Sequence, residues 1–178
     1  MCEKKQLRKC FRALRSDLKN IDWDAKIARN ALEAFGKYDR FFVYLSFGSE
    51  VGTEALIELL KKAGKRVCVP RIVDGEMLSV PLTDKLEEGA FGILAPDCGE
   101  EETCAVAFTP LLSADKEGYR LGYGGGFYDR YFAKHPGIVK VGLAYLGQIT
   151  EKLPHEETDI PLDALVTENG VVRYERKE

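Results

Sequence analysis

The sequence predicts an α/β fold, in which a mostly parallel β-sheet carries helices on both faces. Short apolar segments rich in β-branched and aromatic residues alternate along the chain with segments of helical pattern, as in sheets that are covered on both sides. Strands are expected at residues 41–45, 66–69, 77–82, 105–108, 139–145, 164–166 and 171–174. There is no internal repeat, low-complexity stretch or long linker, so we expect residues 1–178 to form a single domain.

Local signals set the expected ends of several elements. Thr53 is a suitable N-cap for a helix at residues 54–62. Pro70 is expected to end the strand at 66–69, because proline has no backbone N–H to donate. Residues 168–170, Glu-Asn-Gly, have the form of a hairpin turn into the last strand. Ligands of such sheets bind at the carboxyl ends of the strands, which is where we expect the functional site.

An amphipathic helix is expected at the N-terminus. Leu7, Phe11, Leu14 and Leu18 recur at the spacing of one helical face. A stripe of cations borders that face, and it consists of Lys4, Arg8, Arg15 and Lys19. A cation at such a border can pack its stem on the protein and hold its charge over a cleft. Periodicity alone also allows a basic face that is simply solvated.

The composition excludes several classes of protein. Hydrophobic residues make up 45% of the chain and charged residues 31%, as in globular rather than disordered proteins. A net charge of −3 argues against a dedicated nucleic-acid binder, and no apolar run approaches the roughly 20 residues of a membrane span. The five cysteines are irregularly spaced and form no Cys-x-x-Cys pair, so we expect reduced thiols in a cytoplasmic protein. A mitochondrial transit peptide is less consistent with Glu3 and Asp17 in the basic segment.

The densest signal is the glycine-rich segment at residues 120–130, which has four glycines within residues 122–126 and then a helical pattern. Glycines let the backbone approach a ligand closely, and successive N–H groups at the start of a helix attract phosphate. Arg120 could pair with a phosphate, and Asp129 could coordinate the Mg²⁺ that accompanies ATP. The segment lacks the Gly-Lys-Ser/Thr of a Walker A motif and the spacing of a Rossmann fingerprint. A tight turn without a ligand is the structural alternative.

Residues 120–131, RLGYGGGFYDRY, resemble the signature of the 5-formyltetrahydrofolate cyclo-ligase family, also called 5,10-methenyltetrahydrofolate synthetase. Further landmarks of that family follow in order over nearly the whole chain: Lys4-x-x-Leu7-Arg8, Tyr44-Leu45-Ser46, Glu50-Val51-x-Thr53, Phe91-Gly92-Ile93 before Pro96, Pro110, and Leu153-Pro154 leading to Asp159. The chain departs from the usual family pattern at Gly52, Ala95 and Leu111, and its Gly125 stands where some members carry lysine.

The resemblance implies an ATP- and Mg²⁺-dependent ligase that converts 5-formyltetrahydrofolate to 5,10-methenyltetrahydrofolate and releases ADP and phosphate. It implies catalytic roles for Lys4, Arg8 and Arg120. The implied ATP-binding residues are Lys4, Lys5, Gln6, Leu7, Arg8, Arg120, Leu121, Gly122, Tyr123, Gly124, Gly125, Gly126, Phe127 and Tyr128. The implied folate-binding residues are Leu45, Glu50, Tyr123, Gly124, Gly125, Gly126 and Phe127. Asp129 and Asp159 are the implied Mg²⁺ ligands.

Two other functions remain open from the residues. A paralogue of this family could bind ATP and act on a different formyl- or amide-bearing substrate. A noncatalytic module could use the basic helix and the aromatic-flanked glycines to bind RNA, although the acidic balance of the chain disfavours it. We expect a monomer whose partners are ATP and 5-formyltetrahydrofolate, without nucleic acid or membrane.

Overall fold

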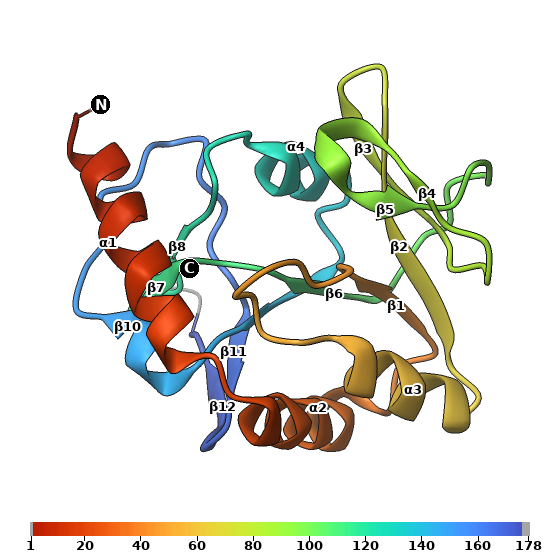
Figure 1. The fold of residues 1–178 in the computed structure, drawn as a ribbon, viewed down its shortest axis with the longest axis horizontal. Coiled ribbons are helices and arrows are strands. Elements are labelled where there is room, and N and C mark those ends of the chain that lie inside the picture. The colour runs from red at the N-terminus through yellow and green to blue at the C-terminus, as the bar shows by residue number, and fades with distance from the viewer. Residues whose placement is uncertain (1, 176–178) are drawn as a thin grey trace.

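A computed structural model describes residues 2–175, which fold around a seven-stranded sheet (Figure 1). The strand order is β12-β11-β9-β6-β1-β2-β3. These strands are β1 (Arg40–Val43), β2 (Arg66–Val73), β3 (Glu76–Pro81), β6 (Val106–Thr109), β9 (Val139–Leu143), β11 (Ala164–Thr167) and β12 (Gly170–Arg173). The five inner strands run parallel, and the two edge strands, β3 and β12, run antiparallel to their neighbours. The predicted fold class is therefore confirmed.

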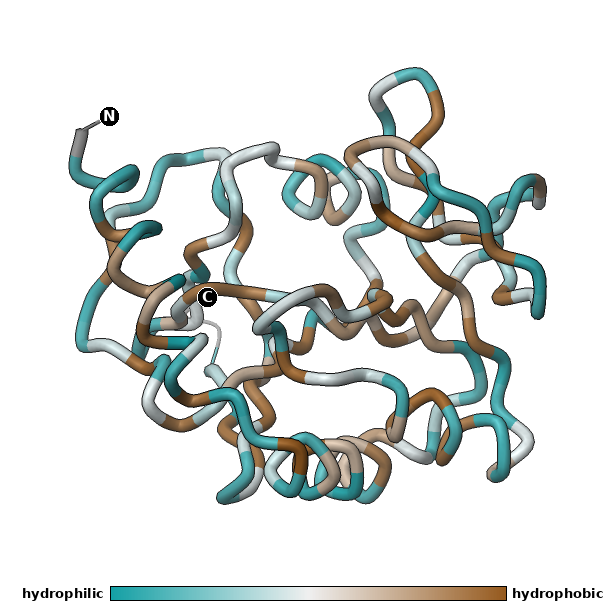
Figure 2. The backbone as a smooth tube through the Cα atoms, in the orientation of Figure 1, coloured by the Kyte–Doolittle hydropathy of each residue, from teal (hydrophilic) through white to brown (hydrophobic). Residues whose placement is uncertain are grey.

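Helices cover both faces of this sheet (Figure 1). They are α1 (Cys2–Leu18), α2 (Ile21–Phe35), α3 (Glu54–Lys62) and α4 (Phe127–Lys134). Phe41 and Val43 of β1 belong to the apolar core under α2 and α3, whereas Phe42 belongs to the core under α4. This division follows from the two-residue repeat of a strand, which points successive side chains to opposite faces. In Figure 2 the hydrophobic residues follow the central strands, and the loops are mostly hydrophilic.

Short elements surround the main sheet. A small three-stranded sheet contains β7 (Ser113–Asp115), β8 (Arg120–Leu121) and β10 (Ile149–Thr150). A flap contains β4 (Glu87–Glu88), the 3-10 turn η1 (Ala90–Gly92) and β5 (Leu94–Ala95). A second 3-10 turn, η2 (Leu146–Gln148), follows β9. Within residues 2–175, no helix is long and apolar enough to cross a membrane.

One expectation about these elements is wrong, and some elements were not expected. Pro70 does not end its strand, because β2 runs on to Val73. The pairing of β2 with β1 covers only Arg66 to Cys68, so Pro70 lies beyond the ladder in which its missing N–H would matter. Helix α2, whose N-cap Asn20 accepts hydrogen bonds from two backbone N–H groups, was not expected from the sequence, and neither was the small three-stranded sheet.

Candidate active site

A cavity of about 1460 Å³ opens where β1 and β6 end. Tyr44 and Leu45 follow β1, and Pro110 follows β6, and all three line the cavity. Further walls come from the N-terminal part of α1, the flap, residues 120–130 and residues 156–160, and from residues 70–72 of β2 and Met77 of β3. The site therefore lies at the carboxyl ends of the parallel strands, as expected for this class of sheet.

The glycine-rich loop joins β8 to α4 and forms one wall. Its conformation requires glycine at Gly124 and Gly126, whose φ angles are +100° and +64°. At Gly124 space is also limiting, because a Cβ atom would lie 3.1 Å from the guanidinium carbon of Arg8. Within the described chain, the backbone N–H groups of residues 122–126 donate no hydrogen bond. These N–H groups are therefore available to an anionic ligand.

Helix α1 places two of its cations against this cavity. Arg8 Nε donates a hydrogen bond of 3.0 Å to the carbonyl oxygen of Gly122. Lys4 Nζ lies 2.8 Å from Asp159 Oδ2 and 3.1 Å from Glu156 Oε1. Burial opposes the charged form of Lys4, but its bonds with the two carboxylates outweigh that effect and raise its pKa. Lys4 and Arg8 share one side of α1 because they are four residues apart.

Three neighbouring residues for which the family resemblance implies ATP binding do not line the cavity. Lys5 and Gln6 are exposed, and Leu7 packs against the buried cluster of Leu112, Leu121 and Leu153. Their positions between Lys4 and Arg8 turn them to other sides of the helix. A direct role for them in ATP binding stays an untested prediction without a contact to support it.

The whole basic stripe of α1 contacts protein atoms. Arg15 donates to the carbonyl oxygen of Leu111, and Lys19, just after the helix, donates to the carbonyl oxygen of Glu50. With the contacts of Lys4 and Arg8, this means that the solvated-face interpretation is wrong. The stripe holds the helix against the loops of the site.

Arg120 and Asp129 form a pair at the base of the glycine loop. Arg120 Nη2 lies 2.9 Å from Asp129 Oδ1, and Nη1 donates 2.7 Å to the carbonyl oxygen of Ile160. Asp129 Oδ1 also accepts from the backbone N–H of Ile160. The N-cap of α4 is Gly126, and no side chain caps that helix end, so Asp129 is not a helix cap. The pair instead ties the loop to residues 156–160.

Asp159, the second predicted metal ligand, lies in the facing segment. Its Oδ2 accepts from Lys4 and from the backbone N–H of Glu156, both at 2.8 Å. Burial favours the protonated form of Asp159, but the bonds with Lys4 and Glu156 outweigh it and lower the pKa. Asp129 and Asp159 both line the cavity, so the structure brings the two predicted Mg²⁺ ligands to one site.

Glu50 also lines the cavity, from the loop after β1. It is buried, its Oε1 accepts a hydrogen bond of 2.6 Å from the Tyr123 hydroxyl, and its Oε2 accepts 2.8 Å from the N–H of Phe47. Burial raises the pKa of Glu50, although both hydrogen bonds oppose the rise. Gly52, one of the departures from the family pattern, has no room for a side chain, because a Cβ would lie 2.7 Å from Asp24 Oδ2.

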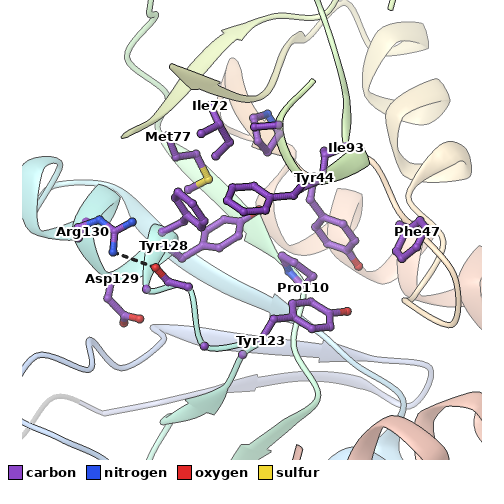
Figure 3. A pocket seen from close by; sticks show the side chains of 18 of the residues that line it. Tyr44, Phe47, Ile72, Met77, Ile93, Pro110, Tyr123, Tyr128, Asp129 and Arg130 are labelled. Carbon is purple, nitrogen blue, oxygen red and sulfur yellow. Dashed lines mark hydrogen bonds between the residues drawn. The ribbon is translucent and has the colours of Figure 1, made fainter. Parts of the chain in front are cut away.

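Several aromatic side chains for which no role was predicted also line the cavity (Figure 3). They are Tyr44, Phe47 and Phe91. The same cavity is lined by Tyr123, Phe127 and Tyr128, which were predicted as binding residues. Phe47 and Phe91 are 77% and 78% exposed, which is unusual for large apolar side chains. Phe91 also has a φ of +61° in the flap and lies edge-on to Phe127, with ring centroids 5.6 Å apart. Periodicity could not reveal these residues, because they meet only across the cavity.

Comparisons with known proteins show the family of the chain. The model of the 5-formyltetrahydrofolate cyclo-ligase family matches residues 1–168. The chain is 40% identical to the 5-formyltetrahydrofolate cyclo-ligase of Escherichia coli (strain K12) over 141 residues, which cover 72% of this chain and 78% of that protein. It is 32% identical to the Haemophilus influenzae protein of the same name over 183 residues, covering 92% and 97% of the two chains.

A solved structure shows the same fold. The NMR structure of Aquifex aeolicus 5,10-methenyltetrahydrofolate synthetase superposes with a TM-score of 0.85 at 32% identity, covering 98% of this chain and 94% of that one. The family match, the relatives and the shared fold thus agree over nearly the full length. This chain belongs to the 5-formyltetrahydrofolate cyclo-ligase family and is an enzyme of the ligase class.

Proposed function

We propose that this enzyme converts 5-formyltetrahydrofolate to 5,10-methenyltetrahydrofolate at the expense of ATP, which becomes ADP and phosphate. One observation carries the proposal beyond family membership: the glycine-rich loop contacts both Arg8 of the cationic α1 (the cationic half of the cavity) and Glu50 with Phe91 (the aromatic half). A phosphoryl donor bound on one side of the loop would meet a flat, partly apolar substrate bound on the other. We also propose that the chain acts as a single-domain monomer in the cytoplasm.

The cationic half suits the phosphates of ATP. The free N–H groups of residues 122–126 can donate to phosphate oxygens, and Lys4 and Arg8 supply positive charge from α1. Arg120 lies deeper, and its side chain is 6% exposed, so its main contribution is to hold Asp129 and Ile160 while adding positive charge to the wall. Phosphoryl transfer depends on such positioned cations more than on covalent help.

Asp129 and Asp159 would hold Mg²⁺. Each uses one carboxylate oxygen for the hydrogen bonds described above, and within residues 2–175 the other oxygen accepts none. Carboxylate oxygens are ligands that Mg²⁺ prefers, so the residues fit the ion. No cluster of three or more His, Cys, Asp or Glu side chains in the described chain could hold a metal alone, so phosphate oxygens and water would complete the coordination. Bound Mg²⁺ would neutralise charge on the phosphates.

The aromatic half suits the folate. Glu50 offers a buried carboxylate that can accept hydrogen bonds from the amino and ring N–H groups of a pterin. Leu45, Phe47 and Phe91 present apolar surface to the flat rings. Tyr123 joins the two halves, because it lies in the glycine loop and donates to Glu50.

The reaction then has two steps. The formyl oxygen of the substrate attacks the γ-phosphorus of ATP, and ADP leaves, which turns a poor leaving group into a phosphate. N10 of the folate next attacks the activated carbon and loses its proton, and phosphate departs with the former formyl oxygen. Lys4 and Arg8 would stabilise the charge on the transferring group, while Glu50 orients the pterin.

An absorbance assay tests the proposal. Purified protein is mixed with ATP, Mg²⁺ and 5-formyltetrahydrofolate, and the near-ultraviolet absorbance of the methenyl product is followed. We expect product to form with ADP in equal amounts, and none without ATP. If 5-formyltetrahydrofolate gave no methenyl product but other formamides stimulated ATP hydrolysis, the chain would instead be a paralogue with a different substrate.

A further inference from the structure

Arg15 is a buried arginine near the C-terminal end of α1 that does not line the cavity but contacts its folate side. It is 3% exposed. Its Nε donates 3.1 Å to Ser49 Oγ, and its Nη1 donates 3.0 Å to the carbonyl oxygen of Leu111. Its guanidinium carbon lies 5.5 Å from the centroid of the Tyr123 ring. One side chain therefore contacts the Glu50 loop, the segment after β6 and the glycine loop.

This arginine has no carboxylate partner of its own in the described chain, where no ion pair includes it. A cation removed from water is costly unless opposite charge lies nearby. Glu50, the residue after Ser49, is the buried carboxylate of this region, and it accepts a hydrogen bond from Tyr123, over whose ring the guanidinium lies. Glu50 is therefore the carboxylate whose charge Arg15 can balance, and the two residues are linked through Tyr123 and Ser49 rather than by direct contact.

We propose that Arg15 is a positioning residue for the folate side: it fixes Tyr123 and the loop that carries Glu50, and it supplies the positive charge that keeps Glu50 ionised for the substrate. This inference rests on the proposed function, because it assumes that Glu50 binds the folate. It assigns the C-terminal end of α1 a role distinct from that of Lys4 and Arg8 at the other end.

The surroundings of Glu50 single out Arg15 for this role. The groups that face Glu50 are Tyr123 from the glycine loop, Tyr44 after β1, Tyr128 of α4, and the cations Arg15 and Lys19. The tyrosines bring no positive charge. Lys19 Nζ lies 2.7 Å from Asp24 Oδ2, so its charge is shared with another carboxylate. Burial raises the pKa of Glu50, and Arg15 is the nearby cation without a carboxylate of its own that opposes this rise.

Two substitutions at Arg15 and one matched control test the proposal. Arg15→Met keeps the length of the stem and removes the charge, whereas Arg15→Lys keeps the charge and removes the planar group that lies on Tyr123. Arg12→Met is the control, because Arg12 is exposed on the same helix and its guanidinium carbon is 5.9 Å from the Tyr123 centroid. The titration of Glu50 is followed by carboxyl ¹³C NMR in the ligand-free protein, and its signal is identified by its loss in Glu50→Gln.

The variants should separate charge from position. In Arg15→Met, the titration midpoint of Glu50 should rise by about one pH unit, and the Kd for 5-formyltetrahydrofolate without nucleotide should weaken about tenfold. Arg15→Lys should keep the midpoint near that of the unchanged protein and still weaken folate binding. In all three variants the Kd for ATP should stay within about twofold, and Arg12→Met should also leave folate binding and the midpoint unchanged within those limits.

Two results would overturn the role of Arg15. One is an unchanged Glu50 midpoint together with unchanged folate affinity in Arg15→Met. The other is a parallel loss of ATP and folate binding with a lower melting temperature in both Arg15 variants, which would mean a purely structural residue. If Arg15→Met does not fold, Arg15→Lys decides by whether folate affinity falls while ATP affinity holds. Failure of the unchanged protein to bind or convert 5-formyltetrahydrofolate would reject the proposed function instead, and the NMR titration would still decide whether Arg15 controls Glu50.

Discussion

Replacement of Glu50 by glutamine removes one negative charge and almost no volume from the folate side. In the structure the carboxylate accepts from the Tyr123 hydroxyl and from the N–H of Phe47. The amide oxygen of glutamine can keep the bond from Phe47, because a backbone N–H can only donate. The amide nitrogen would then face Tyr123, whose hydroxyl can accept as well as donate. The Glu50→Gln variant should therefore keep the local geometry and lose the charge that a pterin would meet.

The expected loss of folate affinity follows from that charge. A hydrogen bond to a charged group contributes about 1.5–3 kcal/mol, and each 1.4 kcal/mol is roughly a factor of ten in Kd. Glu50→Gln should thus weaken 5-formyltetrahydrofolate binding by roughly ten- to a hundredfold. The Kd for ATP should hardly change, because within the described chain Glu50 makes no hydrogen bond to Lys4, to Arg8 or to the backbone N–H groups of residues 122–126, which are the groups proposed to bind phosphate.

The Glu50→Gln substitution should not lower the stability of the fold at neutral pH, although it weakens folate binding. Burial raises the pKa of Glu50, so the folded protein binds this proton more tightly than the unfolded chain does. The stability contributed by that proton is fully present below the unfolded pKa and is lost as the pH rises through the folded pKa. Glutamine removes this dependence. The melting temperature of Glu50→Gln at neutral pH should equal or exceed that of the unchanged protein, and the unchanged protein should gain relative to the variant as the pH falls through the raised pKa.

Titration calorimetry with each ligand and thermal melting between neutral and mildly acidic pH check both parts. Unchanged folate affinity with weaker ATP binding would place Glu50 on the nucleotide side and refute the reasoning. A large fall in melting temperature at neutral pH would show that the carboxylate stabilises the fold in its charged form, contrary to the direction of its pKa shift.

Three further substitutions test the nucleotide side. Arg8→Ala should lower turnover by about a hundredfold but stability by only ~1 kcal/mol, because it removes a cation and one hydrogen bond to a loop carbonyl; equal losses in activity and melting temperature would mean a structural role. Asp129→Asn keeps an oxygen for Arg120 but removes the charge, so the variant should fold and need much more Mg²⁺ for half-maximal activity; an unchanged Mg²⁺ requirement would falsify the metal role. Gly124→Ala should destabilise the loop by about 1–2 kcal/mol and raise the KM for ATP, whereas Gly137→Ala, where nothing lies within 4 Å of the added carbon, should do neither.

Sequence patterns predicted most of the local structure because the hydrogen bonds and side-chain periodicity of helices and strands are local. The helix expected at residues 54–62 has those bounds as α3, and the hairpin at residues 168–170 joins β11 to β12. Helix α2 could have been predicted from the sequence, because Asn20 caps it and apolar residues follow at helical spacing. The path of β2 through Pro70 could not be read locally, because it depends on where the neighbouring strand ends.

Some features of the candidate site could likewise be predicted from the sequence, and others depend on tertiary structure. The sequence by itself determined the glycine loop, the cations at Lys4 and Arg8, and family membership, because these rest on short motifs. Only the tertiary structure decided that Tyr123 donates to Glu50, 73 positions away along the chain, and that Arg15 contacts both the Tyr123 ring and Ser49 beside Glu50. Such contacts arise because parallel strands joined by crossovers bring distant loops to one edge of the sheet, and no local pattern records which side chains then meet.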